Sequence, residues 1–150
     1  LISLLTRFSF KFKEQARSPR KVYAVDTGLA NAIGFRFSEN WGRLAESLVL
    51  LELRRHQSIN PALEIYYFKD SHQRELDFVI KEGLSVTQLI QVAWTLEQPK
   101  TKDRERKALL SAMEEFNLQQ GTVITEDFEG TESIDEKLIN YVPLWRWLLA

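Results

Sequence analysis

The sequence predicts an α/β domain built on a mixed sheet, and three stretches carry this prediction. The first is a long helix from Trp41 to about His56, whose apolar residues cover more than one face. The second is a meander of three strands between Ile65 and Trp94. The third is an amphipathic helix from Thr101 to Phe116, followed by a short buried strand at 122–125. From Trp41 onward the expected order is therefore helix, strand, strand, strand, helix, strand.

Length and composition place the chain among single soluble domains. Its 150 residues are 44% hydrophobic and 27% charged, which is enough to bury a sizeable core. The absence of cysteine excludes disulfides, cysteine-bound zinc and thiol chemistry, and it fits a cytoplasmic location. Apolar runs such as Leu48 to Leu51 are far too short to span a bilayer, so we expect no membrane partner.

Missing motifs and the charge distribution narrow the function further. No GxxxxGK[ST] loop is present, and His56 and His72 have no second histidine or cysteine at ligand spacing, which excludes ATP binding by that loop and argues against zinc or serine-hydrolase chemistry. Residues 1–60 hold ten Lys or Arg against five Asp or Glu, whereas residues 61–150 hold ten against sixteen. Such asymmetry can mark a face for nucleic acid, but without a dense basic arm any DNA binding would come from local patches.

The segments outside the three main stretches are shorter. Residues 1–12 alternate loosely and predict a strand that runs into a loose hairpin, and residues 21–25 predict a second strand. Asp26 follows that strand directly, which favours a capping role over a catalytic one. A helical turn closed by Gly34 is expected at 29–33, and Ser38 or Asn40 is expected to cap the long helix. The chain starts without Met in what resembles the middle of a strand, which indicates a fragment of a longer polypeptide.

The C-terminal third predicts a simple path after the buried strand. An acidic loop from Glu126 to Glu136 leads to an apolar segment at 137–142. A docked helical turn is expected at 144–149, where the two tryptophans at helical spacing are better explained as core than as a binding surface.

Two carboxylates stand out inside predicted regular elements. In the strand 75–80, alternation places Leu76, Phe78 and Ile80 on the core face, with Glu75, Asp77 and Val79 opposite. A solvated outer face of the sheet would explain the two acids simply, whereas a partly buried pair would need a cation or a proton.

The second carboxylate is Glu46, in the long helix. It is either paired with Arg43 at helical spacing or directed at something that needs negative charge.

Three linked motifs resemble a known family. They are Lys21–Leu29 (KVYAVDTGL), Gly42–Glu46 (GRLAE) and Arg74–Ile80 (RELDFVI), and together they resemble the C-terminal domain of unknown function of prokaryotic AAA-type P-loop ATPases. The element order is in turn similar to the common core of the PD-(D/E)xK nuclease superfamily. The resemblance implies a restriction-endonuclease-like core with an N-terminal strand or hairpin extension. It also implies that residues 1–20 are the remnant of a preceding winged-helix-like segment and that residues 21–150 form the nuclease-like domain.

The same resemblance implies the site and its cofactor. Asp77 would be the principal Mg²⁺ ligand, Glu46 the supporting acid, and Gln91 would stand in the place of the second acid. Ala93 stands where the family has its catalytic lysine, with Lys69 or Lys81 as remote substitutes. Because one negative charge and the lysine are lost, we expect weak Mg²⁺ binding and little or no phosphodiester cleavage.

Two function classes follow from this reading. The first is an accessory C-terminal domain of an ATPase, with a degraded nuclease site, that binds DNA or a partner; its ATP-binding P-loop domain would lie upstream in the same polypeptide. The alternative is a Mg²⁺-dependent DNA nuclease with an atypical site. A bare dimerisation module is a third possibility, which would show an apolar surface patch. The geometric expectation is that the oxygens of Glu46, Asp77 and Gln91 converge on one cleft.

Overall fold

The computed structural model of the protein describes residues 2–26, 28 and 41–150, and the mixed α/β class and the predicted element order are both confirmed there. The helical turn predicted at 29–33, Gly34 and the proposed caps Ser38 and Asn40 lie outside the described residues. From Trp41 the elements are α3 (Trp41–Ile59), β3 (Leu63–Lys69), β4 (Glu75–Glu82), β5 (Ser85–Val92), α4 (Pro99–Glu115), β6 (Gln120–Thr125), β7 (Gly130–Ile134), β8 (Lys137–Pro143) and α5 (Leu144–Leu148).

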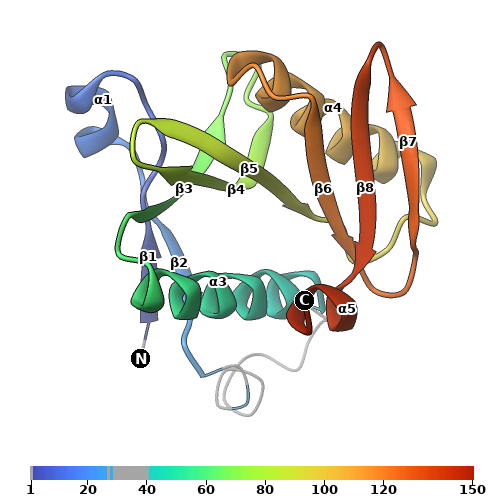
Figure 1. The fold of residues 1–150 in the computed structure, drawn as a ribbon, viewed down its shortest axis with the longest axis horizontal. Coiled ribbons are helices and arrows are strands. Elements are labelled where there is room, and N and C mark those ends of the chain that lie inside the picture. The colour runs from blue at the N-terminus through green and yellow to red at the C-terminus, as the bar shows by residue number, and fades with distance from the viewer. Residues whose placement is uncertain (1, 27, 29–40) are drawn as a thin grey trace.

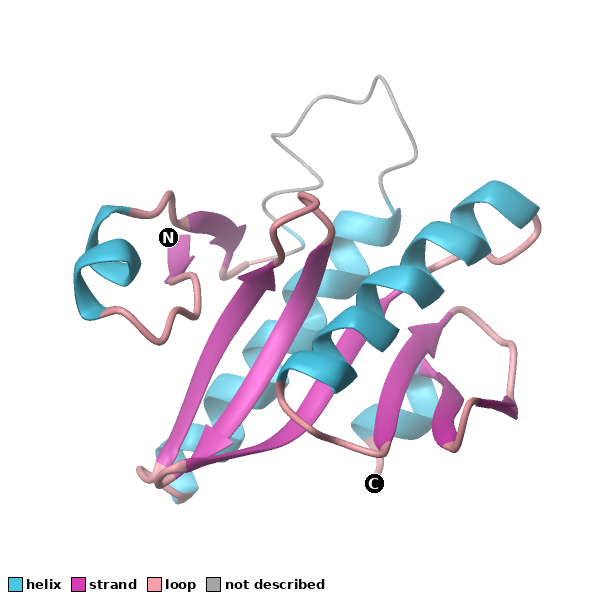
Figure 2. Cartoon of the chain, turned by 90° about the horizontal axis from the view of Figure 1, so that it is seen from above, coloured by secondary structure: helices cyan, strands magenta, loops and turns pink. Residues whose placement is uncertain are grey.

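Six strands form one mixed sheet in the order β3-β4-β5-β6-β8-β7. The β3-β4-β5 meander is antiparallel as expected, whereas β6 pairs parallel with both β5 and β8. Helix α3 and the short α5 lie on one face of the sheet and α4 lies on the other, so the sheet is the middle of three layers (Figures 1 and 2). The β5-β6 pair can be parallel because α4 carries the chain from the end of β5 back to the start of β6. The β6-β8 pair can be parallel because β7, which is antiparallel to β8, lies between these two strands in the chain.

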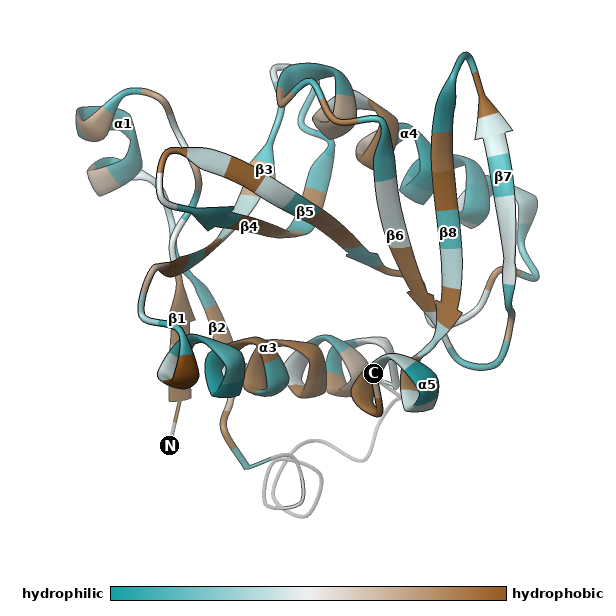
Figure 3. Ribbon diagram, in the orientation of Figure 1, coloured by the Kyte–Doolittle hydropathy of each residue, from teal (hydrophilic) through white to brown (hydrophobic). Residues whose placement is uncertain are grey.

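Each face of the sheet has its own apolar core. The core on the α3 side includes Leu50 and Phe78, and the core on the α4 side includes Leu109 and Met113; all four side chains are fully buried. The middle turns of α3 are strongly hydrophobic (Figure 3), which explains why this helix is buried on several sides. Gly121 in β6 allows α4 to approach closely, since a Cβ at this position would lie 2.8 Å from the Leu109 side chain.

The N-terminal region differs from the expected local hairpin. Strand β1 (Ile2–Leu5) pairs antiparallel with β2 (Lys21–Ala24), and a short helix α1 (Phe12–Arg17) lies between them. This long-range pairing forms because Leu5 reaches the α3-side core, where it is fully buried. The β1-β2 hairpin, as we call residues 2–24, therefore shares a core with the remainder of the domain. Its opposite face exposes Ile2 and Val22.

The predicted acidic loop at 126–136 is partly wrong, because it contains strand β7. This strand pairs antiparallel with β8, starting from the Ile134↔Lys137 pair. The two residues between them, Asp135 and Glu136, have φ angles of 47° and 68°. Two successive positive φ values suit a tight two-residue hairpin turn, but such turns normally contain Asn or Gly. Neither residue type is present here, so the turn could not be recognised from composition.

A β-bulge in β4 changes which side chains share a face. Tyr66 pairs with Val79 and Phe68 pairs with Leu76, so Asp77 and Phe78 together oppose one residue of β3. A bulge of this kind interrupts the alternation of side chains. Phe78 accordingly lies in the α3-side core, whereas Leu76 and Val79 lie in the α4-side core. The expected grouping of Leu76 with Phe78 is therefore wrong.

Candidate functional site

The four positions implied by the nuclease resemblance, Glu46, Asp77, Gln91 and Ala93, all line one cleft of about 1010 Å³. The cleft opens where β4 and β5 separate beyond the Phe78↔Ile90 pair, and its walls come from β2, α3, β4, β5 and α4. The structure therefore brings together positions that lie on three separate elements. Their side chains do not all point to the same place.

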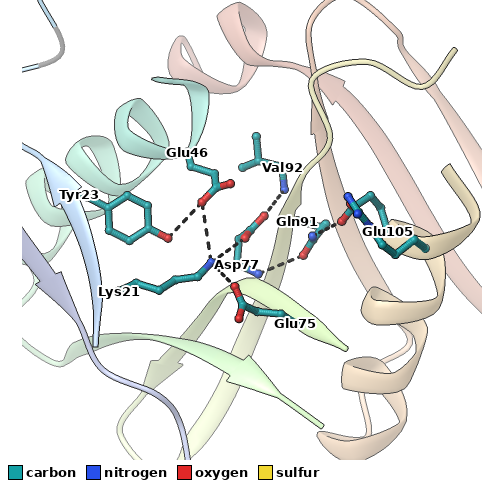
Figure 4. Close-up of polar contacts among 9 residues, drawn as sticks. Lys21, Tyr23, Glu46, Glu75, Asp77, Gln91, Val92 and Glu105 are labelled. Atoms are coloured by element: carbon teal, nitrogen blue, oxygen red, sulfur yellow. Dashed lines mark hydrogen bonds and ion pairs between the residues drawn. The ribbon is translucent and has the colours of Figure 1, made fainter. Parts of the chain in front are cut away.

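Asp77 is directed to the α3 side of the sheet by the bulge. Its side chain is almost fully buried. One carboxylate oxygen lies 3.0 Å from Nζ of Lys21, and the other accepts the backbone N–H of Val92 at 3.0 Å (Figure 4). The carboxylate thus takes over one rung of the strand ladder where the two backbones have separated. The solvated outer face considered for this residue does not occur.

Glu46 projects from α3 toward the same point. Its Oε2 accepts a hydrogen bond from the Tyr23 hydroxyl at 3.3 Å and lies 3.8 Å from Nζ of Lys21. Within the described residues it forms no ion pair with Arg43, so the first of the two alternatives for Glu46, pairing at helical spacing, is not found. Both of its partners come from the β1-β2 hairpin.

Gln91 faces away from the two acids. Its Oε1 accepts the backbone N–H of Asp77 at 3.0 Å, and its Nε2 donates to the carboxylate of Glu105 on α4 (Figure 4). Ala93, on the same strand face, is buried in the α4-side core. The amide of Gln91 therefore links β4, β5 and α4, and its oxygen does not converge with those of Glu46 and Asp77.

The cation that lies among the acids is Lys21, which sequence reasoning did not identify. Neither Lys69 nor Lys81, the two substitutes considered, lines the cleft, and Lys81 pairs with Glu64 at 2.9 Å. Lys21 lies at the start of β2, and alternation places it on the same face as Tyr23. That spacing is visible in the sequence, but the pairing that brings β2 beside β4 and α3 is not.

Burial and mutual repulsion perturb the acids of the cluster. Burial, followed by the charge of Asp77, raises the pKa of Glu46 to about 7. Burial also raises the pKa of Asp77, with Lys21 acting in the opposite direction. For Lys21, burial disfavours the ammonium, but the charge of Asp77 and the other acids outweighs it, and the pKa of Lys21 is raised. Lys21 is therefore charged at neutral pH, whereas the Glu46 carboxyl gains and loses its proton near neutral pH.

The stability of the domain is expected to fall as the pH rises from about 5 to about 8. In this range the folded protein retains a proton on Glu46 that the unfolded chain, with an ordinary pKa of 4.5, has released. Because the folded state binds more protons than the unfolded chain, the free energy of unfolding falls with rising pH, by an amount on the order of 1 to 3 kcal/mol. Urea unfolding at these two pH values measures the change in the free energy of unfolding. Glu46→Gln should remove most of the slope; a slope unchanged in that variant would contradict the assignment.

The side chains as they stand do not fit the Mg²⁺ implied by the resemblance. The Lys21 ammonium already lies among the carboxylate oxygens, and the oxygen of Gln91 is engaged by the Asp77 backbone. Across the part of the chain that the structure describes, no three Asp, Glu or His side chains form a group arranged to hold a metal ion. Mg²⁺ needs several oxygen ligands and loses its bound waters reluctantly. The Lys21 ammonium, which already lies between the carboxylates, therefore disfavours Mg²⁺ binding.

Comparison with known proteins gives a family without an assigned activity. Over its full length the chain is 38% identical to an uncharacterized protein of Methanocaldococcus jannaschii, and it spans about a third of that relative, 33%. No solved structure matches the chain. None of the described helices is both long and apolar enough to cross a membrane. Residues 41–147 match the family described as domain of unknown function DUF4143. The chain therefore belongs to the DUF4143 family.

Proposed function

We propose that this domain is a non-catalytic accessory module of a larger prokaryotic polypeptide, with a restriction-endonuclease-like core that binds DNA in the cleft and does not cleave it. The observation that carries the proposal is the state of the would-be active site. Asp77 is tied to Lys21 and to a backbone N–H, Gln91 is tied to Glu105, and Ala93 is buried. The side chains that would perform cleavage are thus used to hold the strands, the hairpin and α4 together.

The rim of the cleft supports DNA as the ligand. Arg43 and Arg104 line it, and both are exposed at the surface of the domain. Trp41 lines it as well and is half exposed. Guanidinium groups neutralise backbone phosphates, and an exposed indole offers a face on which a base can stack. The floor is acidic, so the phosphates would contact the rim.

The larger polypeptide is proposed to be a cytoplasmic AAA-type ATPase. The support is the motif resemblance and the relative that is about three times as long as this chain. The P-loop domain would bind ATP and act as the main partner of this domain. Sequencing the complete reading frame tests this: a GxxxxGK[ST] loop and ATP hydrolysis by the full-length protein are expected, and their absence would refute the association.

DNA binding is expected to be measurable by fluorescence anisotropy and to weaken with salt. Changing both Arg43 and Arg104 to Gln should lower the affinity by roughly tenfold and reduce the salt slope by about two, since each phosphate contact contributes about one. Changing both Lys13 and Arg17 to Gln is the matched control, because both residues are exposed on α1 and neither lines the cleft. Equal loss in both variants, or no DNA binding by the unchanged protein, would refute the cleft as the binding site.

The alternative, a metal-dependent nuclease, has one observation in its favour. The Lys21 ammonium lies 3.0 Å from Asp77, so a lysine is present beside the principal acid after all. Incubating the domain with single- and double-stranded DNA and Mg²⁺ or Mn²⁺ decides between the two. Cleavage that Asp77→Asn abolishes would establish a nuclease, whereas equal background in both proteins supports the accessory module.

A further inference from the structure

Three carboxylates from two elements surround one ammonium group. Nζ of Lys21 lies 2.7 Å from Glu75 Oε1, 3.0 Å from Asp77 Oδ1 and 3.8 Å from Glu46 Oε2, as Figure 4 shows. A divalent ion would need these oxygens closer together, since Mg²⁺ draws its ligands in to about 2.0–2.1 Å. As they stand, the side chains of this acid cluster, as we call Glu46, Glu75 and Asp77, surround the ammonium and are not arranged to hold a metal ion.

The surroundings of the ammonium suit a lysine. The centroids of the Tyr67 and Tyr23 rings lie 5.6 Å and 6.0 Å from Nζ of Lys21. Aromatic faces attract an ammonium and pack against its methylene stem, whereas Mg²⁺ usually retains several waters that these rings could not coordinate. The lysine side chain is only about one fifth exposed. The tyrosines and the acids together form a binding site for the Lys21 ammonium.

The same lysine fastens the β1-β2 hairpin to the sheet. Lys21 is the first residue of β2, while Glu46 belongs to α3 and Asp77 to β4. Nearby, the Tyr67 hydroxyl donates to the carbonyl oxygen of Pro19 at 2.5 Å, which fixes the residues just before β2. A metal ion at the centre of the acid cluster would displace the ammonium and remove one of these attachments.

We propose that Lys21 is a built-in cation that takes the place of a divalent metal, so that docking of the β1-β2 hairpin and binding of a divalent cation by the acid cluster exclude each other. The lysine neutralises part of the charge that the acids would otherwise direct at a metal. The hairpin thereby places a side chain of the same protein where a metal ion would otherwise bind. The inference does not depend on DNA binding, because both the cation and the hairpin can be observed without DNA.

Mn²⁺ titration followed by electron paramagnetic resonance tests the exclusion. Lys21→Met should bind Mn²⁺ at least about tenfold more tightly than the unchanged protein, and adding Asp77→Asn should abolish that gain. Lys21→Arg is the matched control, since it keeps a cation among the acids and should bind Mn²⁺ no better than the unchanged protein. Equal affinity of the unchanged protein and a folded Lys21→Met variant would overturn the proposal.

A measurement on the unchanged protein keeps the test valid should Lys21→Met fail to fold. The ¹⁵Nζ resonance of Lys21 should show slow hydrogen exchange, because the ammonium is bonded to Glu75 and Asp77. Millimolar Mn²⁺ should leave this resonance no broader than those of lysines remote from the cluster. Selective broadening by Mn²⁺, or exchange as fast as that of a free surface lysine, would refute the built-in cation.

Discussion

Replacing Asp77 with alanine is expected to lower the free energy of unfolding by about 2 to 4 kcal/mol. The change removes a carboxylate that lies 3.0 Å from the Lys21 ammonium, and it leaves the buried N–H of Val92 without an acceptor. Breaking a buried ion pair from one side costs about 3 to 5 kcal/mol when the other charge is left uncompensated. Glu75 still lies 2.7 Å from Lys21, so the ammonium keeps one close partner and the cost is somewhat smaller. Urea unfolding followed by circular dichroism measures the loss.

Asp77→Asn separates the two roles of this carboxylate. Asparagine retains the shape and one oxygen, so it can still accept the N–H of Val92, but it carries no charge. If the backbone contact matters, Asp77→Asn should be more stable than Asp77→Ala by about 1 to 2 kcal/mol, the cost of a buried donor without a partner. Equal stability of the two variants would show that the charge alone accounts for the loss, and would contradict the proposed role in joining β4 to β5.

The elements that could be predicted from the sequence are those with strong local signals. The helix from Trp41, the three-strand meander and the amphipathic helix before β6 all carry periodic apolar patterns, and all three occur in the structure. The pairing of β1 with β2 could not be predicted, because it joins Leu5 to Lys21 across an intervening helix. Long-range pairings of this kind depend on burial in a core whose residues are far apart in the sequence, so no local pattern predicts them.

The candidate site was predictable in its positions but not in its contacts. Motif resemblance selected Glu46, Asp77 and Gln91, and all three line one cleft. Alternation along β4, however, fails at the bulge between Asp77 and Phe78, which no residue type in that strand announces. The lysine that reaches the acids comes from the hairpin, 56 residues before Asp77. A cluster assembled from three elements cannot be read from the spacing within any one of them.

Replacing Phe78 with alanine is expected to cost about 3 to 5 kcal/mol and to loosen the β1-β2 hairpin selectively. Phe78 is fully buried in the α3-side core, and its ring centroid lies 6.1 Å from that of Tyr23 in β2. Truncating a buried phenylalanine loses its transfer free energy and leaves a cavity. Because that cavity would open directly beneath the hairpin, amide hydrogen exchange in β1 and β2 should increase more than exchange in β6.

Met113→Ala provides the control on the other side of the sheet. Met113 is also fully buried, but it belongs to the α4-side core, against which Phe8 packs but to which strands β1 and β2 contribute no buried residue. Its truncation should cost about 2 to 5 kcal/mol without a selective effect on β1 and β2. A hairpin that opens equally in the two variants, once compared at equal global stability, would mean that Tyr23 and Phe78 do not hold it. In that case polar contacts, the ion cluster at Lys21 and the Tyr67–Pro19 hydrogen bond among them, would anchor the hairpin, and Lys21→Met should increase exchange in β1 and β2 selectively.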